Sequence, residues 1–266
     1  MVIISKLPSL EITHANNLNN KSSNHKIKNL SPSALLLFKE CQKKFEYKYV
    51  YNMPDKKPIS WEQIMLGSFI HLILEKGVKE NFQTEKQFID LTKQLHREEQ
   101  WQNVDLDKAI HLIKIFYIRN KNKYNKQSKT EQFLQMKLGG LNFVGFADRI
   151  DFTPNGLEII DYKTGQSNIY ALNRNWQLGY YALAAQKIGK VHKITLDMLQ
   201  HDKPLEFELD NRGVAHCIGA DRISFNLYDI EKELVDAAHE IAYAYENGFE
   251  PCPIEKGCEF CQEYFY

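Results

Sequence analysis

The stretch from Phe143 to Gly165 most constrains the fold of this chain. Two apolar runs, Phe143–Phe152 and Leu157–Tyr162, flank the segment Thr153-Pro154-Asn155-Gly156. Proline and Asn-Gly at this spacing are typical of a tight turn between two strands. The sequence therefore predicts a β-hairpin in the middle of the chain.

Two carboxylates and a lysine are predicted at adjacent strand ends of this hairpin. Because side chains alternate across a strand, Asp161 and Lys163 share one face while Tyr162 points the other way. The turn brings Asp148 of the first strand close to this pair. Carboxylate oxygens suit Mg²⁺ or Mn²⁺, which activate a water for attack on a phosphate, and a lysine steadies the charge that develops. Ordinary exposed charges at the end of a hairpin explain the same pattern. The D-x-K spacing alone therefore does not distinguish a catalytic metal site from a solvent-exposed hairpin end.

Length and charge bound the class of protein. The 266 residues suit one large domain that folds without disulfides, so the five cysteines are expected to be thiols or metal ligands. Lysine plus arginine equal aspartate plus glutamate, 34 each, which removes any global signal for nucleic acid but does not exclude a nuclease with acidic metal ligands. No apolar run approaches the roughly 18 residues of a membrane helix, and the start lacks the pattern of a signal peptide. We expect a cytoplasmic protein without membrane association.

The rest of the chain is predicted to supply helices and further strands around the hairpin. Residues 1–28 are rich in Asn, Ser and Lys and are expected to be a flexible leader. Residues 29–266 are predicted to form a single α/β domain with a central mixed sheet flanked by helices, a helical insertion at 80–126 and a cysteine-containing tail at 249–266. The expected helices are Ser31 to residue 51, Trp61–Lys79, two within 84–126, Ile169–Lys187 and Ser224–Glu246, and the expected strands are Phe133–Leu138, Leu141–Phe152, Leu157–Tyr162, Val191–Leu199 and Leu205–Leu209.

His71 is a candidate ligand from the helix Trp61–Lys79. It shares one helix face with Gly67 and Glu75, and a glycine one turn earlier lets another backbone or a ligand approach closely. An imidazole that faced the strand carboxylates would be a third metal ligand and would favour transition ions such as Mn²⁺. A lone histidine on a half-apolar helix is more often a hydrogen-bonded core residue, and by itself that interpretation is preferred.

Gln177 and Tyr181 lie one helical turn apart after Lys163. An amide and a phenol on the same helix face can reach a DNA backbone or base edge. The competing interpretation is that Trp176, Tyr180 and Tyr181 form the core face of the helix, and we prefer it for Tyr180.

The cysteines form a further pattern. Cys258 and Cys261 make a C-x-x-C, Cys252 stands shortly before the pair, and Cys41 is far upstream. Soft thiolates at such spacing bind a [4Fe–4S] cluster or zinc, although unligated thiols in a frayed tail fit equally well. Cys217 has the surroundings of an ordinary small buried residue.

Taken in order, these residues resemble the RecB-like branch of the PD-(D/E)XK nuclease superfamily, which includes the nuclease domains of RecB and AddB and exonucleases associated with CRISPR adaptation. The matching segments are Ser31-Pro32-Ser33 with Phe38, Cys41 and Phe45, Gly67–His71 (G-x-x-x-H), Gly145–Asp151 (G-x-x-D-R-x-D), Asp161–Gly165 (D-Y-K-T-G) and Gln177–Tyr181 (Q-h-x-x-Y). The resemblance covers residues 29–266, and five motifs in order are hard to obtain by chance.

The resemblance implies a restriction-endonuclease-like core and DNA cleavage with Mg²⁺ or Mn²⁺. Carried over by position, the implied roles are metal binding for His71, Asp148, Asp161 and the Tyr162 main-chain carbonyl, catalysis for Lys163 with Asp148 and Asp161, and site support and DNA contact for Gln177 and Tyr181. Members with an iron–sulfur cluster carry an early cysteine, then C-x-x-C, then a later cysteine. No cysteine follows Cys261 in this sequence, so the implied [4Fe–4S] ligands are Cys41, Cys252, Cys258 and Cys261.

The leading hypothesis is a metal-dependent DNA nuclease, an exonuclease or flap-trimming enzyme that acts on single strands or DNA ends in repair, recombination or CRISPR adaptation. The sequence has no helicase motor, so any unwinding requires a helicase or another repair or CRISPR protein as a partner. An alternative is a non-catalytic DNA-binding or assembly subunit with a nuclease fold. A weaker one is a redox or metal sensor built around the cysteines.

Overall fold

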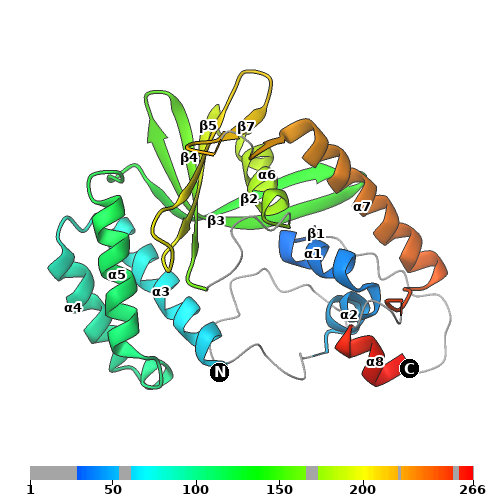
Figure 1. Cartoon of the computed structure of the whole chain (residues 1–266), viewed down its shortest axis with the longest axis horizontal. Coiled ribbons are helices and arrows are strands. Elements are labelled where there is room, and N and C mark those ends of the chain that lie inside the picture. Colours follow the sequence, from blue (N-terminus) through cyan, green and yellow to red (C-terminus); the bar gives the residue numbers. More distant parts are fainter. Residues whose placement is uncertain (1–28, 54–60, 166–172, 221–222, 254–257, 266) are drawn as a thin grey trace. The chain divides into compact units, whose positions relative to one another are not determined.

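The computed structural model describes residues 29–53, 61–165, 173–220, 223–253 and 258–265 (Figure 1). The chain divides into two compact units. The first unit takes its described residues from within Met1–Lys56, Gln135–Val144 and Lys232–Tyr266, and the second takes them from within Lys57–Leu134 and Gly145–Glu231. Residues 1–28, the predicted leader, lie outside the described residues.

The described strands form one mixed sheet in the order β1-β3-β4-β5-β6-β7-β8, with β2 paired to β3. β4 pairs with β5 in parallel, whereas β3 with β4 and β5 with β6 are antiparallel. The prediction of an α/β fold with a mixed sheet flanked by helices is therefore confirmed. The strands are β1 (Asn29–Leu30), β2 (Lys129–Leu138), β3 (Leu141–Thr153), β4 (Gly156–Lys163), β5 (Val191–Met198), β6 (Leu205–Leu209), β7 (Val214–Cys217) and β8 (Ser224–Asn226).

The predicted central hairpin is β3 and β4. Arg149 lies opposite Ile160 in the antiparallel register, and Thr153 lies opposite Gly156 at the turn. Gly156 has a φ of 130°, and a side chain there would collide with the main-chain carbonyl of Lys190. Glycine is therefore required at this position both by its backbone angle and by its neighbour.

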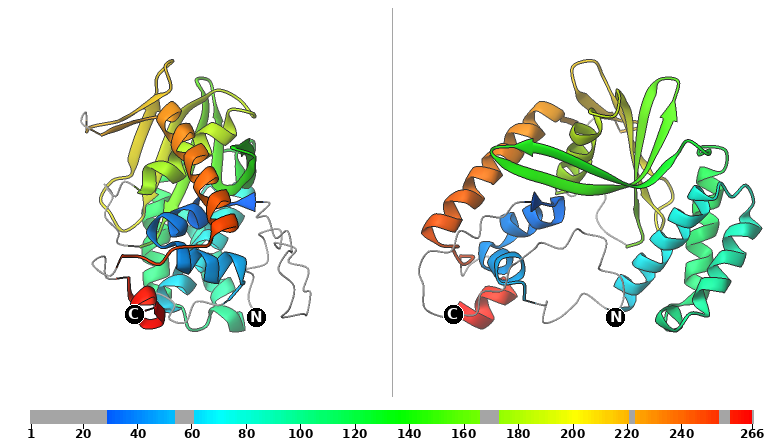
Figure 2. Two further views of the ribbon diagram at one scale, coloured as in Figure 1. Left: turned by 90° about the vertical axis from the view of Figure 1, so that its right-hand side faces the viewer. Right: turned by 180° about the vertical axis from the view of Figure 1, so that it is seen from behind.

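Helices α3, α4 and α5 pack against one another in the second unit, where they lie side by side (Figure 1 and the right-hand view of Figure 2). Helix α6 packs against β4 and β5. These helices are α3 (Trp61–Lys79), α4 (Glu85–His96), α5 (Leu106–Asn120) and α6 (Asn173–Ala185), with a short 3₁₀ turn at Glu99–Trp101. The predicted helix Trp61–Lys79 and the two helices within 84–126 are confirmed.

The first unit holds two short helices where one long helix was expected. Helix α1 (Pro32–Glu40) ends at Cys41, whose backbone is extended, and α2 (Gln42–Phe45) begins directly after it. The sulfur of Cys41 accepts the main-chain N–H of Lys44, so this residue caps the second helix and breaks the first. The prediction of one continuous helix was wrong for this reason. A π-helical turn (Glu46–Val50) follows α2, and α8 (Glu259–Phe265) is the last helix.

The predicted helix Ser224–Glu246 also begins later than expected. Its first residues form β8, which pairs with β7 through Ala215 and Phe225, and helix α7 (Leu227–Asn247) follows. Both strands are too short to show the alternation by which strands are recognised in a sequence. Cys217 on β7 is buried, as predicted. Among the described residues, no helix is long and apolar enough to cross a membrane.

Candidate active site

His71 on α3 reaches Asp148 on β3. The imidazole Nδ1 lies 3.2 Å from Oδ1 of Asp148, and the other carboxylate oxygen accepts the main-chain N–H of Tyr162 at 2.6 Å. A side chain at Gly67 would lie 3.1 Å from the Oγ1 of Thr164, so glycine lets α3 come close to the end of β4. The expected glycine-assisted approach of this helix to the strand ends is thus present.

Asp161 forms the other half of the site at the end of β4. Its carboxylate is buried, with Oδ2 2.8 Å from the Nζ of Lys163 and Oδ1 accepting the side-chain amide of Gln177 at 3.3 Å. The same amide lies 3.1 Å from the hydroxyl of Tyr181. The residues predicted from the sequence for this site therefore meet within the second unit, from two strands and two helices.

The two aspartates hold their charges unequally. Burial favours the neutral form of Asp148, but the adjacent His71 outweighs it and the pKa of this carboxyl is lowered. Burial and the nearby Asp148 raise the pKa of Asp161, and Lys163 offsets only part of that increase. Two carboxylates that repel each other in a buried site are stabilised when a divalent cation lies between them. The electrostatics and the oxygen and imidazole donors fit such an ion.

In the metal-free protein, His71 is expected to titrate well above the normal range. Burial alone would lower its pKa, but the carboxylate of Asp148 raises it to about 9. This value lies above the 6.5 of an unperturbed histidine. The contact of the protonated imidazole with Asp148 therefore stabilises the folded state fully below pH about 6.5, and this stabilisation is lost as the pH rises through about 9. An NMR titration of the imidazole in EDTA measures this pKa, and Asp148→Asn should return it toward the unperturbed value. A wild-type pKa at or below the unperturbed value would contradict the assigned contact.

Glu131 is a site residue that the sequence analysis missed. Ligand atoms of His71, Glu131 and Asp148 all lie within 4.8 Å of one another. Glu131 stands near the start of β2 with a φ of 47°, a left-handed backbone that is uncommon for residues other than glycine. The polar run around it gave no apolar alternation, and no D-x-K or G-x-x-x-H spacing includes it. Only the distance between its carboxylate and the ligand atoms of His71 and Asp148 in the folded protein reveals its place.

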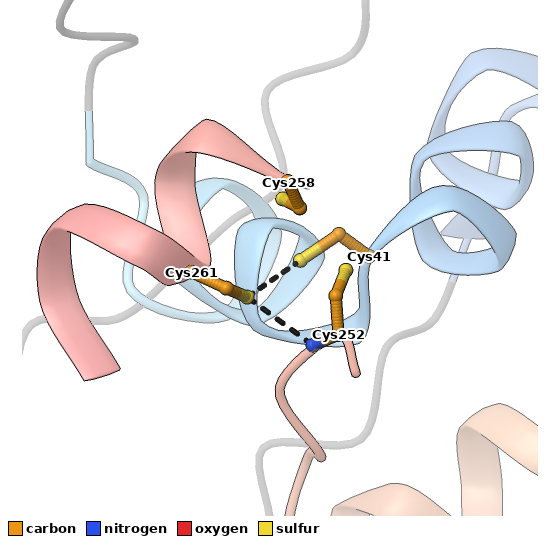
Figure 3. Close-up of side chains that lie close together, drawn as sticks. All are labelled: Cys41, Cys252, Cys258 and Cys261. Atoms are coloured by element: carbon orange, nitrogen blue, oxygen red, sulfur yellow. Dashed lines mark hydrogen bonds between the residues drawn. The ribbon is translucent and has the colours of Figure 1, made fainter. Parts of the chain in front are cut away.

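The four predicted cysteine ligands also meet, within the first unit (Figure 3). The sulfur atoms of Cys41, Cys252, Cys258 and Cys261 all lie within 4.8 Å of one another, and those of Cys41 and Cys261 are 3.4 Å apart. Cys252, which precedes the C-x-x-C pair in the sequence, is the fourth residue of this group. The frayed-tail interpretation does not fit three buried thiols and one half-buried thiol in contact.

Main-chain N–H groups donate to two of these sulfurs. The N–H of Cys252 donates to the sulfur of Cys261 at 3.2 Å, as that of Lys44 does to Cys41 at 3.3 Å. Burial raises the pKa of the Cys41 thiol, whereas for Cys258 hydrogen bonds to the sulfur outweigh burial and lower the pKa. Four thiols without a carboxylate among them suit zinc or an iron–sulfur cluster and not Mg²⁺.

The sequence matches the family model of the PD-(D/E)XK nuclease superfamily over residues 29–263. The chain belongs to this superfamily. The fold agrees with a crystal structure of a presumed exonuclease from Eubacterium rectale, with a TM-score of 0.52 and 13% identity over 94% of this chain and 95% of that one. The protein SSO0001 aligns with a TM-score of 0.45 and 16% identity over 90% of this chain and 86% of its own. No curated protein matches the sequence.

Membership in the PD-(D/E)XK superfamily confirms the resemblance and the restriction-endonuclease-like core. It supports a phosphodiester hydrolase that acts on DNA, since the superfamily is one of nucleases. The individual roles of the site residues stay predictions, and so do the metal, the exonuclease mode of action and the pathway.

Proposed function

We propose that this protein is a metal-dependent deoxyribonuclease that degrades single-stranded DNA or DNA ends as an exonuclease. The observation that carries the proposal is the set of contacts joining His71, Asp148, Asp161 and Lys163 in one unit. An imidazole, two buried or half-buried carboxylates and a lysine beside the end of β4 match the needs of phosphodiester hydrolysis. The structurally similar protein from Eubacterium rectale is described as a presumed exonuclease. At 13% identity, the similarity to it supports the fold and not the activity.

Mg²⁺ or Mn²⁺ is the proposed ion. Its ligands would be His71, Asp148, Asp161 and the main-chain carbonyl of Tyr162, with Glu131 near enough to His71 and Asp148 to join them. Three carboxylates balanced by one lysine leave two negative charges, which equal the charge of one divalent ion. When bound, the ion lowers the pKa of a water molecule and stabilises charge on the phosphate.

The protein groups supply position and charge around that chemistry. Lys163 is held 2.8 Å from Asp161, and its ammonium would steady the attacking water or the phosphate oxygen. Gln177 holds the other oxygen of Asp161 and so keeps the carboxylate plane fixed. Tyr181, which contacts the same amide, supports Gln177 from α6 and is a candidate DNA contact.

We also propose that Cys41, Cys252, Cys258 and Cys261 hold one [4Fe–4S] cluster. The closed set of four sulfurs would join the junction of α1 and α2 to the C-terminal segment of the first unit. Its proposed role is structural, because a ligand set drawn from the two ends of the sequence closes a long loop. A zinc ion is the alternative that the same thiols allow.

The proposed setting is cytoplasmic DNA repair, recombination or CRISPR adaptation, with a helicase or another protein of those pathways supplying unwound DNA. The proposed substrate ends would then be produced by the partner and degraded at this site.

A cleavage assay on linear DNA labelled at the 5′ or the 3′ end, together with circular single-stranded DNA, tests the proposed function. With Mn²⁺ or Mg²⁺, the wild-type protein should shorten one or both linear substrates and leave the circle intact, while Asp161→Asn should cleave neither. Cleavage of the circle would show an endonuclease. DNA binding without cleavage in any divalent ion would favour the non-catalytic DNA-binding subunit instead.

A further inference from the structure

Next to the metal ligands in sequence are residues whose side chains point to the other face of the sheet. Arg149 follows Asp148 on β3, and Tyr162 stands between Asp161 and Lys163 on β4. We propose that Arg149 is a positioning residue that, through Tyr162, fixes the ligand-bearing end of β4 for metal binding. The inference rests on the proposed nuclease function and adds a buried group to it.

Arg149 is 1% exposed, and its guanidinium forms hydrogen bonds or ion pairs with three side chains. It donates from Nη1 to the hydroxyl of Tyr162 at 2.6 Å and from Nη2 to Oδ1 of Asn120 at 3.0 Å. Nη2 also lies 3.0 Å from the carboxylate of Asp151. A planar guanidinium with donors in fixed directions holds its partners in a defined geometry, which an ammonium cannot do.

The partners of Arg149 are themselves anchored to the neighbouring helix and strand. Asn120 at the end of α5 donates to Asp197 at 2.9 Å and to the carbonyl of Phe116 at 3.1 Å. Asp197 on β5 also accepts Arg119 at 2.7 Å. Asp197 lies directly opposite Tyr162 in the parallel register. The network thus connects α5, β3, β4 and β5 beneath the site.

The charges in this layer balance, with Arg119 and Arg149 matched by Asp151 and Asp197. Burial raises the pKa of Asp151, and the adjacent guanidinium opposes that change. A buried ionic network is seldom the most stable way to fill a core, because apolar residues of the same size often do as well. The network instead restrains side-chain orientation, since each hydrogen bond fixes the orientation of one side chain.

Tyr162 carries that orientation to the metal ligands. Its main-chain N–H donates to Asp148 at 2.6 Å, and its ring packs edge-on against the imidazole of His71 with centroids 6.4 Å apart. The two residues that flank it, Asp161 and Lys163, move with its backbone. Anchoring the phenol of Tyr162 to Arg149 therefore restrains contacts to four groups of the proposed site at once.

The test compares Tyr162→Phe with Tyr180→Phe. The first variant removes the phenol oxygen that accepts the Nη1 hydrogen bond of Arg149, and the second removes another buried hydroxyl, which donates to the carbonyl of Leu134 at 3.1 Å. Mn²⁺ affinity is measured by calorimetry, and exchange of the Tyr162 amide hydrogen is measured in metal-free protein. We expect Tyr162→Phe to weaken Mn²⁺ binding about 10- to 100-fold and to speed the exchange of that amide, with Tyr180→Phe close to wild type in both.

The outcomes separate this inference from the proposed function. Wild-type affinity and wild-type amide exchange in Tyr162→Phe would overturn the positioning role of Arg149, even if the variant melted at a lower temperature. A wild-type protein that bound no Mn²⁺ would overturn the metal site itself, and the amide exchange would still report whether the hydroxyl fixes the strand. Arg149→Lys, which keeps the charge but loses the planar fork, should show the same direction of change as Tyr162→Phe.

Discussion

Lys163→Ala is expected to lower the rate of DNA hydrolysis about 100- to 1,000-fold without weakening metal binding. The ammonium of Lys163 is 2.8 Å from Asp161, where it offsets the carboxylate charge that a divalent cation would otherwise offset. Its removal takes away the group proposed to stabilise the attacking water or the phosphate charge. It also removes a cation that competes for the Asp161 carboxylate, so Mn²⁺ affinity should stay the same or increase.

Lys193→Ala is the matched control for this prediction. Lys193 is also a largely buried lysine on the same sheet, 2.6 Å from Glu206 and 3.4 Å from Glu158, but it is not part of the proposed site. Single-turnover cleavage and Mn²⁺ titration of both variants separate a chemical role from lost stability. A Lys163→Ala protein that cleaved DNA at the wild-type rate, or a Lys193→Ala protein that lost as much activity, would contradict the assignment.

The hairpin and its charged residues were predictable because their determinants are local. Alternation along β4 places Asp161 and Lys163 on one face, and the Pro-Asn-Gly turn sets the register that brings Asp148 beside them. His71 needed more than local pattern, because the contact joins residues far apart in sequence. The order of the motifs along the sequence predicted that His71 lies near Asp148. In the structure the two side chains are 3.2 Å apart.

The features that the sequence analysis did not predict depend on contacts that leave no recognisable pattern in the neighbouring sequence. Cys41 breaks a helix because its sulfur accepts a main-chain N–H, a cap seldom read from cysteine. Glu131 approaches His71 and Asp148 only after β2 pairs with β3. Arg149 belongs to a recognised motif, but its partner Asn120 comes from the end of a separate helix. Periodicity and spacing describe one segment at a time, so none of these pairings follows from them.

Cys261→Ser is expected to remove most of the metal bound by the first unit and to lower its free energy of unfolding by about 4 kcal/mol if the wild-type site is filled at a thousand times its dissociation constant. Cys261 is buried, its sulfur is 3.4 Å from that of Cys41, and it accepts the main-chain N–H of Cys252. A serine hydroxyl is a poor ligand for soft metals, so the remaining three thiols lose a closed site.

Metal analysis and denaturant unfolding of anaerobically purified protein measure both effects, with Cys217→Ser as the control. Cys217 is also buried but lies on β7, outside the four-sulfur site, so its replacement should cost only the burial of a hydroxyl and leave the metal content unchanged. Iron with inorganic sulfide in the wild-type protein would support the cluster, whereas zinc alone would replace it with a single ion. Metal content and stability equal to wild type in Cys261→Ser would show that the four thiols do not form a metal site, because removing one of four ligands cannot leave a closed tetrahedral set intact.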